Sequence, residues 1–215
     1  MLSIASLIDY FNHLGSAGST ILLALVGSGA WLFQKFISFL LWELSRRGRV
    51  IEIANALKSE IADLKKSLDQ EYSEENRKEI LEKLETLARQ KKPRALMLAA
   101  TDDNFIFESV KQELSKLPLS ALGSVLAFYN ANGLFLESYK RQATDLFAKS
   151  SLEDQKIIVG ENYKDADSCK LTSKAAVREL EFVVAKNYLA IALIICALAL
   201  SAFWIFDFLQ MHLTF

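Results

Sequence analysis

The sequence has few of the side chains on which enzyme active sites are most often built. It contains two histidines, His13 and His212, near opposite ends of the chain, and two cysteines, Cys169 and Cys196, without metal-ligand spacing. No glycine-rich phosphate loop, nucleophile elbow or HExxH motif is present. We therefore expect no enzyme activity, no cofactor and no bound metal.

Proline is also rare, with only Pro93 and Pro118 in 215 residues. The alternation of apolar and polar residues that is typical of β-strands is absent, and apolar residues recur at helical spacing instead. The sequence therefore predicts an all-α fold.

Charged residues are scarce in two long apolar stretches, residues 20–42 and 188–206, where Lys35 is the single charged side chain. At ~1.5 Å per residue, helices of these lengths reach roughly 34 and 28 Å, which matches the ~30 Å hydrocarbon core of a bilayer. We predict two transmembrane helices, at 20–43 and 187–206, that flank a helical bundle.

The positive charge is placed asymmetrically around these stretches. The outer flanks, 1–19 and 207–215, contain no lysine or arginine, whereas Arg46, Arg47 and Lys186 follow or precede the spans on the inner side. Because positive charge collects on cytoplasmic flanks, the domain at 44–186 should be cytoplasmic and both termini should lie outside. This topology predicts a membrane protein with an outer interfacial segment at 1–19 and an outer tail at 207–215.

The predicted domain carries a heptad-like apolar seam directly after the first span. We expect the helix of the span to continue past Gly48 into this seam, which could supply the contacts of an oligomer. Its apolar positions are Val50, Ala54, Leu57, Ile61, Leu64 and Leu68.

Several later elements are predicted from capping and turn residues. Ser73 should cap a helix, and Pro118 should begin a helix that continues past Gly133 to Lys149. Residues 105–117 should form one helix, residues 161–171 a polar loop, and a last helix should run from Thr172 into the second span.

Lys35 lies about 6 Å to the cytoplasmic side of the middle of the first span, since one helical residue rises ~1.5 Å. A lysine at this depth usually faces a bundle interior or water, so Lys35 is a candidate pore-lining residue together with Ser28 and Gly29. The alternative is that the span is shifted to residues 15–34 and that Lys35 extends into the cytoplasmic headgroups.

Small residues in both spans are candidates for close helix packing, because membrane helices approach one another where side chains are small. These residues can join subunits of an oligomer or pack the two spans of one chain. Since two spans cannot enclose an aqueous path, any channel must be a homo-oligomer in the lipid bilayer. The residues are Gly27, Ala192, Cys196 and Ala199.

A basic cluster away from the membrane flank is the candidate ligand site. Arg89, Lys91, Lys92 and Arg94 could hold a phosphate-bearing ligand, or could be a solvated helix end. The acidic pairs Asp102–Asp103 and Asp165–Asp167 are interpreted as helix caps or loop residues rather than metal ligands.

One segment resembles a known pattern: residues 104–110 (NFIFESV), followed by Leu117–Pro118 and by residues 125–129 (VLAFY). It is similar to small bacterial membrane proteins that act as effectors of anti-phage defence, such as the membrane partner of Hailong-type systems. This resemblance implies an oligomeric ion channel gated by a nucleotide or short oligonucleotide from a companion nucleotidyltransferase. It carries over no functional residue.

Taken together, these features predict an oligomeric membrane effector, a ligand- or partner-gated ion channel that depolarises the inner membrane in anti-phage defence. The alternative is a non-conducting membrane scaffold whose cytoplasmic bundle recruits a protein partner.

Overall fold

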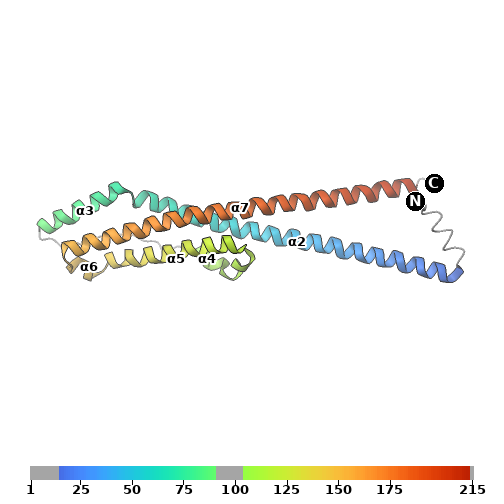
Figure 1. The fold of residues 1–215 in the computed structure, drawn as a ribbon, viewed down its shortest axis with the longest axis horizontal. Coiled ribbons are helices and arrows are strands. Elements are labelled where there is room, and N and C mark those ends of the chain that lie inside the picture. Colours follow the sequence, from blue (N-terminus) through green and yellow to red (C-terminus); the bar gives the residue numbers. More distant parts are fainter. Residues whose placement is uncertain (1–14, 91–103, 214–215) are drawn as a thin grey trace. The chain divides into compact units, whose positions relative to one another are not determined.

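The computed structural model describes residues 15–90 and 104–213, and every regular element in these ranges is a helix, which confirms the all-α fold (Figure 1). The elements in chain order are α2 (Gly15–Glu71), α3 (Glu74–Arg89), α4 (Phe105–Val110), the 3-10 helix η1 (Lys111–Lys116), α5 (Leu119–Gln142), α6 (Asp145–Lys149) and α7 (Leu152–Leu213).

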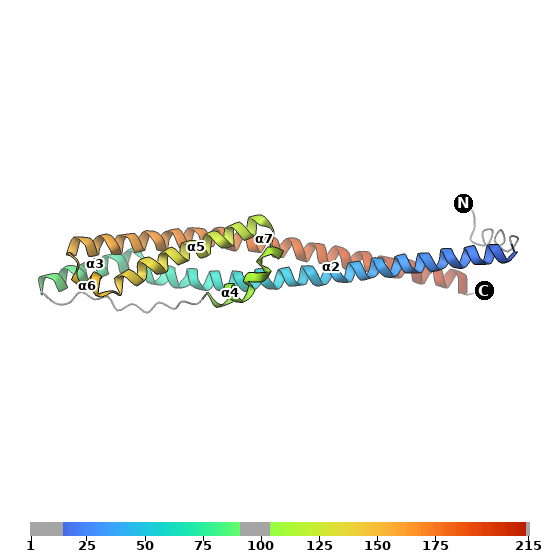
Figure 2. The same cartoon turned by 90° about the horizontal axis from the view of Figure 1, so that it is seen from below.

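The chain divides into two compact units. One is the helical domain, residues 48–192, and the other consists of residues 1–47 and 193–215. Within the helical domain, α5 lies alongside the first half of α7 (Figure 2), where the Asn162 amide donates a hydrogen bond of 2.9 Å to the Ser138 hydroxyl. A Lys156–Glu85 ion pair of 2.9 Å joins α7 to α3.

Two helices in the described ranges are long and apolar enough to cross a membrane, by length and composition. One is α7, over Leu152–Trp204, and 6% of its most apolar 18-residue segment is buried. The other is α5, where 39% is buried and which contributes Val125 and Phe128 to the core. We therefore interpret α5 as a core helix of the domain.

The expected spans lie in the two longest helices. The stretch at 187–206 belongs to α7, which is one of these two long apolar helices. The stretch at 20–43 belongs to α2, which over its described side chains is not one of the two. Large apolar side chains of α2 are nevertheless exposed there, among them Trp31, Leu32 and Phe36.

The capping prediction at Ser73 is confirmed. Ser73 accepts a hydrogen bond of 3.2 Å from the backbone N–H of Asn76 and so satisfies a donor at the start of α3. The Asn76 amide in turn donates to the carbonyl oxygens of Gln70 and Glu71, each at 3.0 Å. This small network holds the tight turn between α2 and α3.

Three predicted helix boundaries were wrong. Residues 161–171 are not a loop but part of α7, because Asn162, Ala166 and Cys169 form a buried stripe at helical spacing among polar neighbours. The helix from Leu119 ends at Gln142, since Thr144 caps the separate helix α6. Residues 105–117 are divided between α4 and η1 rather than forming one helix.

The heptad-like seam of α2 is buried inside the chain's own domain. Ala54, Leu57 and Ile61 are fully buried, and they belong to one apolar cluster with Phe128 of α5 and Leu180 of α7. The expectation that this seam joins subunits was wrong, because its apolar face is already covered by α5 and α7. The continuation of the first helix past Gly48 is confirmed by the bounds of α2.

A buried carboxylate, Glu60 of α2, takes the place of a capping residue for α4. Its two oxygens accept hydrogen bonds from the backbone N–H groups of Ile106 at 2.7 Å and Phe107 at 3.1 Å. They also accept from the Tyr129 hydroxyl, which comes from α5. The Tyr129 ring stacks on Phe107 with centroids 3.9 Å apart. Burial and the Glu60 carboxylate together raise the pKa of Tyr129 above its ordinary value.

A second polar contact follows in the same core. The Asn132 amide of α5 donates to the Asn104 side chain at 3.1 Å, while the Cys169 thiol of α7 lies 3.8 Å from the Asn132 side-chain oxygen. Cys169 is fully buried, and burial raises the pKa of its thiol to about 12.

We predict that Glu60→Ala destabilises the start of α4. The substitution leaves the Ile106 and Phe107 N–H groups and the Tyr129 hydroxyl without an acceptor, and each buried unsatisfied donor costs ~1–3 kcal/mol. Hydrogen exchange of the peptide that spans α4 should become faster, and the thermal unfolding midpoint of the full chain should fall.

Glu60→Gln, which keeps one carbonyl oxygen as an acceptor, should have a smaller effect. Glu161→Ala, at an exposed position of α7, is the control. Equal exchange of α4 in the wild type and Glu60→Ala would show that Glu60 does not cap this helix.

Candidate functional site: a basic groove between α2 and α7

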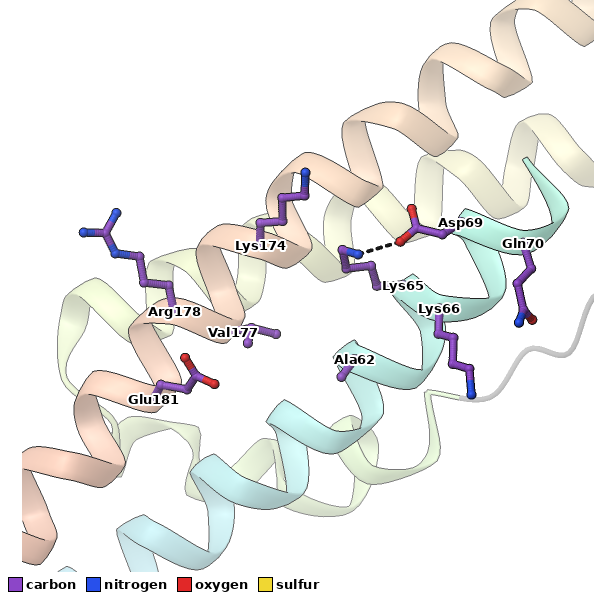
Figure 3. A pocket seen from close by; sticks show the side chains of 9 residues that line it. All are labelled: Ala62, Lys65, Lys66, Asp69, Gln70, Lys174, Val177, Arg178 and Glu181. Carbon is purple, nitrogen blue, oxygen red and sulfur yellow. Dashed lines mark hydrogen bonds and ion pairs between the residues drawn. The ribbon is translucent and has the colours of Figure 1, made fainter. Parts of the chain in front are cut away.

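A groove of about 540 Å³ lies between α2 and α7 within the helical domain (Figure 3). Its two walls come from distant parts of the sequence. The α2 wall consists of Ala62, Lys65, Lys66, Asp69 and Gln70, and the α7 wall of Lys174, Val177, Arg178 and Glu181.

Helical spacing explains how these side chains come together. Ala62, Lys66 and Gln70 are four residues apart, so they follow one face of α2 next to the buried seam. Lys174 and Arg178 are related in the same way on α7, where Ala176 and Leu180 point into the core. The short side chain of Ala62 and the half-buried Val177 leave space between the two helices.

The groove holds four cationic and two anionic side chains, so its lining carries an excess of positive charge although the chain as a whole has a net charge of −1. The Lys65 ammonium group lies 2.5 Å from the Asp69 carboxylate. This hydrogen bond, followed by the charges of Lys65, Lys170 and Lys174, holds the pKa of Asp69 below its usual range. Glu181 is 4.0 Å from Lys58.

Three of the cations remain available. Among the described residues, Lys66, Lys174 and Arg178 have no hydrogen bond and no ion pair within 4.0 Å. Figure 3 shows Lys65 and Asp69 joined at the α2 wall, whereas the side chains of Lys174 and Arg178 extend from α7 toward solvent. An anion in the groove could therefore gain these cations as ligands without breaking an existing pair.

The basic cluster expected from the sequence lies elsewhere. Arg89 is exposed at the end of α3 and does not line the groove, and Lys91, Lys92 and Arg94 lie outside the described residues. Its role as a ligand site stays a prediction.

The acidic pairs give no metal site in the ranges that the structure describes. Asp165 and Asp167 lie within α7, where Asp167 is 3.4 Å from Lys170, and Asp102 and Asp103 fall outside the described residues. No group of three or more histidine, cysteine, aspartate and glutamate side chains that could hold a metal ion occurs in residues 15–90 and 104–213.

The candidate pore and packing residues are on exposed helix surfaces. The Lys35 ammonium group lies 5.8 Å from the centre of the Trp31 ring, and Ser28 is exposed. A side chain placed at Gly27 or Gly29 would meet nothing within 4 Å. Ala192, Cys196 and Ala199 are exposed on α7. Both assignments, pore lining and helix packing, stay predictions.

The groove could not be predicted from the sequence because its walls are more than 100 residues apart. One signal was available. Lys65–Lys66 and Lys174–Arg178 each lie beside a buried apolar stripe, at the edge where a neighbouring helix would be expected. What the sequence does not give is which helix forms the other wall.

Comparisons with protein-family models, curated proteins and solved structures found no match to this chain.

We predict that Lys65→Ala raises the pKa of Asp69 toward its ordinary value, because the substitution removes the hydrogen bond that lowers it most. The wild-type carboxylate should keep its charge to a lower pH than the variant carboxylate. A pH titration of the Asp69 carboxyl carbon by NMR measures the difference.

Lys66→Ala is the matched control, since it removes a neighbouring lysine that makes no hydrogen bond with Asp69. A shift of the same size in both variants would mean that general positive charge, and not the Lys65 contact, sets the titration.

Proposed function

We propose that this protein is a homo-oligomeric effector of the bacterial inner membrane that allows ions to leak when its helical domain engages an anionic ligand or a partner. The observation that carries the proposal is the length of α7. The same 62-residue helix forms one wall of the basic groove with Lys174 and Arg178 and then continues into the apolar stretch at 187–206.

The α2 helix has a similar organisation and supports the same proposal. It contributes Lys65 and Lys66 to the groove, and it also contains the apolar stretch at 20–43 with Lys35. A ligand that contacts both walls would therefore act on both helices that are expected to enter the bilayer. The proposed topology places the domain in the cytoplasm and both termini outside.

Exposed groups on the expected spans support an oligomeric assembly. Placing a lysine near the bilayer centre in contact with lipid costs at least ~2.5 kcal/mol of insertion free energy. Lys35 avoids this cost if it faces water or other protein. Gly27 and Gly29 have open space around them, and Ala192 is exposed, so a neighbouring subunit could approach closely at these positions. A role in anti-phage defence, as in Hailong-type systems, is part of this proposal.

A non-conducting scaffold is the second candidate, and the exposed face of α5 favours it. Leu119, Leu126 and Leu134 are 86%, 41% and 61% exposed on one side of a helix whose other side is core. An apolar face of this kind could recruit a partner protein. A ring of several subunits in mild detergent favours the channel, whereas a monomer or dimer favours the scaffold.

We predict that the purified protein conducts ions in planar bilayers once an anionic ligand or a partner is bound to its helical domain. We also predict that Lys35→Leu changes the conductance or the ion selectivity. Lys35→Arg keeps the positive charge and should preserve the selectivity of the wild type. Single-channel recording of the three proteins is the measurement.

Two results would count against this proposal. Absence of conductance under all conditions would favour the scaffold, and identical currents from wild type and Lys35→Leu would place Lys35 among the lipid headgroups.

The topology makes a separate prediction. A reporter enzyme that is active only outside the cytoplasm should be active when fused after residue 215 and inactive when inserted in the α5–α6 turn at Ala143. The opposite pattern would invert the proposed orientation.

A further inference from the structure

We propose that the groove between α2 and α7 binds a small soluble anion with two or more phosphate groups, which bridges the two walls. The available cations are distributed over both walls of the groove. Lys66 lies on the α2 wall, whereas Lys174 and Arg178 lie on the α7 wall. A single anionic group can reach one wall, but an anion with separated charges can contact both at once.

The two carboxylates of the groove do not neutralise its three available cations. Asp69 is paired with Lys65 at 2.5 Å, and Glu181 has Lys58 as its nearest cation at 4.0 Å. The charges left over are therefore those of Lys66, Lys174 and Arg178, which have no such partner in the described part of the chain. Gln70 adds an uncharged donor at the edge of the groove.

The kinds of side chain favour phosphate over other anions. Three of the four cations are lysines, which bind phosphate as flexible point charges, whereas planar carboxylates are recognised best by paired arginine forks. No aromatic residue is among the nine that line the groove, so there is no platform on which a nucleobase could stack. Recognition should therefore depend on the phosphate groups themselves.

Binding would also change the relation between the two walls. Without a ligand, Lys174 and Arg178 extend from α7 away from α2 (Figure 3), and the excess positive charge of the lining opposes a closer approach of the two walls. A bridging polyanion would neutralise this repulsion and draw α2 and α7 together within the helical domain. Any effect of this movement on the expected membrane helices rests on the proposed function, whereas binding itself does not.

The test is calorimetric titration of the full-length protein in detergent micelles with sodium tripolyphosphate. We expect saturable binding that weakens as salt is raised, because neutralising phosphate charge releases counterions. Inorganic phosphate should bind at least about tenfold more weakly, since it can contact only one wall. Protein in nanodiscs that contain phosphatidic acid, titrated beside neutral nanodiscs, separates a lipid headgroup from a soluble ligand.

The decisive variant is Lys174→Glu/Arg178→Glu, which should lower the affinity for tripolyphosphate by at least about tenfold through the loss of two charge-assisted contacts. The matched control is Lys78→Glu/Lys164→Glu, which makes the same change in net charge at exposed positions outside the groove and should bind like the wild type. Lys174→Gln/Arg178→Gln provides a milder pair if the charge reversal prevents folding.

Several outcomes would overturn the inference. The first three are an absence of saturable tripolyphosphate binding, equal affinities of the wild type and both groove variants, and an equal loss of affinity in the control pair. The other two are tighter binding of an oligoglutamate peptide of equal charge, and weaker tripolyphosphate binding in nanodiscs that contain phosphatidic acid. Because the readout is binding, failure of the channel proposal would leave this result intact, and a conducting protein that ignores tripolyphosphate would refute the inference alone.

Discussion

The apolar face of α2 between Val50 and Leu68 is the constraint on which the helical domain depends. Its buried residues recur every three or four positions, so one side of the helix is in contact with α5 and α7 over several turns. The side chains next to this face are consequently held at the edge of the contact. Lys65 and Lys66 lie at that edge, and the geometry of the basic groove follows directly from the packing of the core.

Inside this apolar contact, the polar groups around Glu60 link three helices by hydrogen bonds. Removing a carboxylate from water is costly, and the cost is offset here because three donors surround it. The donors come from α4 and α5, while Glu60 belongs to α2, so the interaction fixes three elements in one register. Apolar packing alone would tolerate small displacements among these helices, whereas hydrogen bonds to a buried carboxylate do not.

The sequence was sufficient for the features that depend on local spacing. The all-α class, the apolar face at Ala54, Leu57 and Ile61, the cap at Ser73 and the continuation of α2 past Gly48 all follow from patterns within about two turns of helix. Residues 161–171 were misjudged because their polar composition hides a narrow buried stripe, which only the packing partner reveals.

Long-range features could not be predicted in the same way. The role of the seam was misjudged because an apolar heptad pattern does not say whether a partner chain or the same chain covers it. The groove joins residues more than 100 positions apart, and Glu60 caps a helix that begins 45 residues later. Both depend on which helices become neighbours, and that is decided by the whole core rather than by any one segment.

The burial of Cys169 has a practical consequence for anyone who labels this protein. A thiol with a pKa of about 12 and no exposed surface is almost entirely in its unreactive protonated form at neutral pH. Replacing Cys196 alone would therefore create a background that is silent toward maleimides. Spin labels or fluorophores could then be introduced at chosen sites on α2 and α7 to follow their separation, while the native core stays intact.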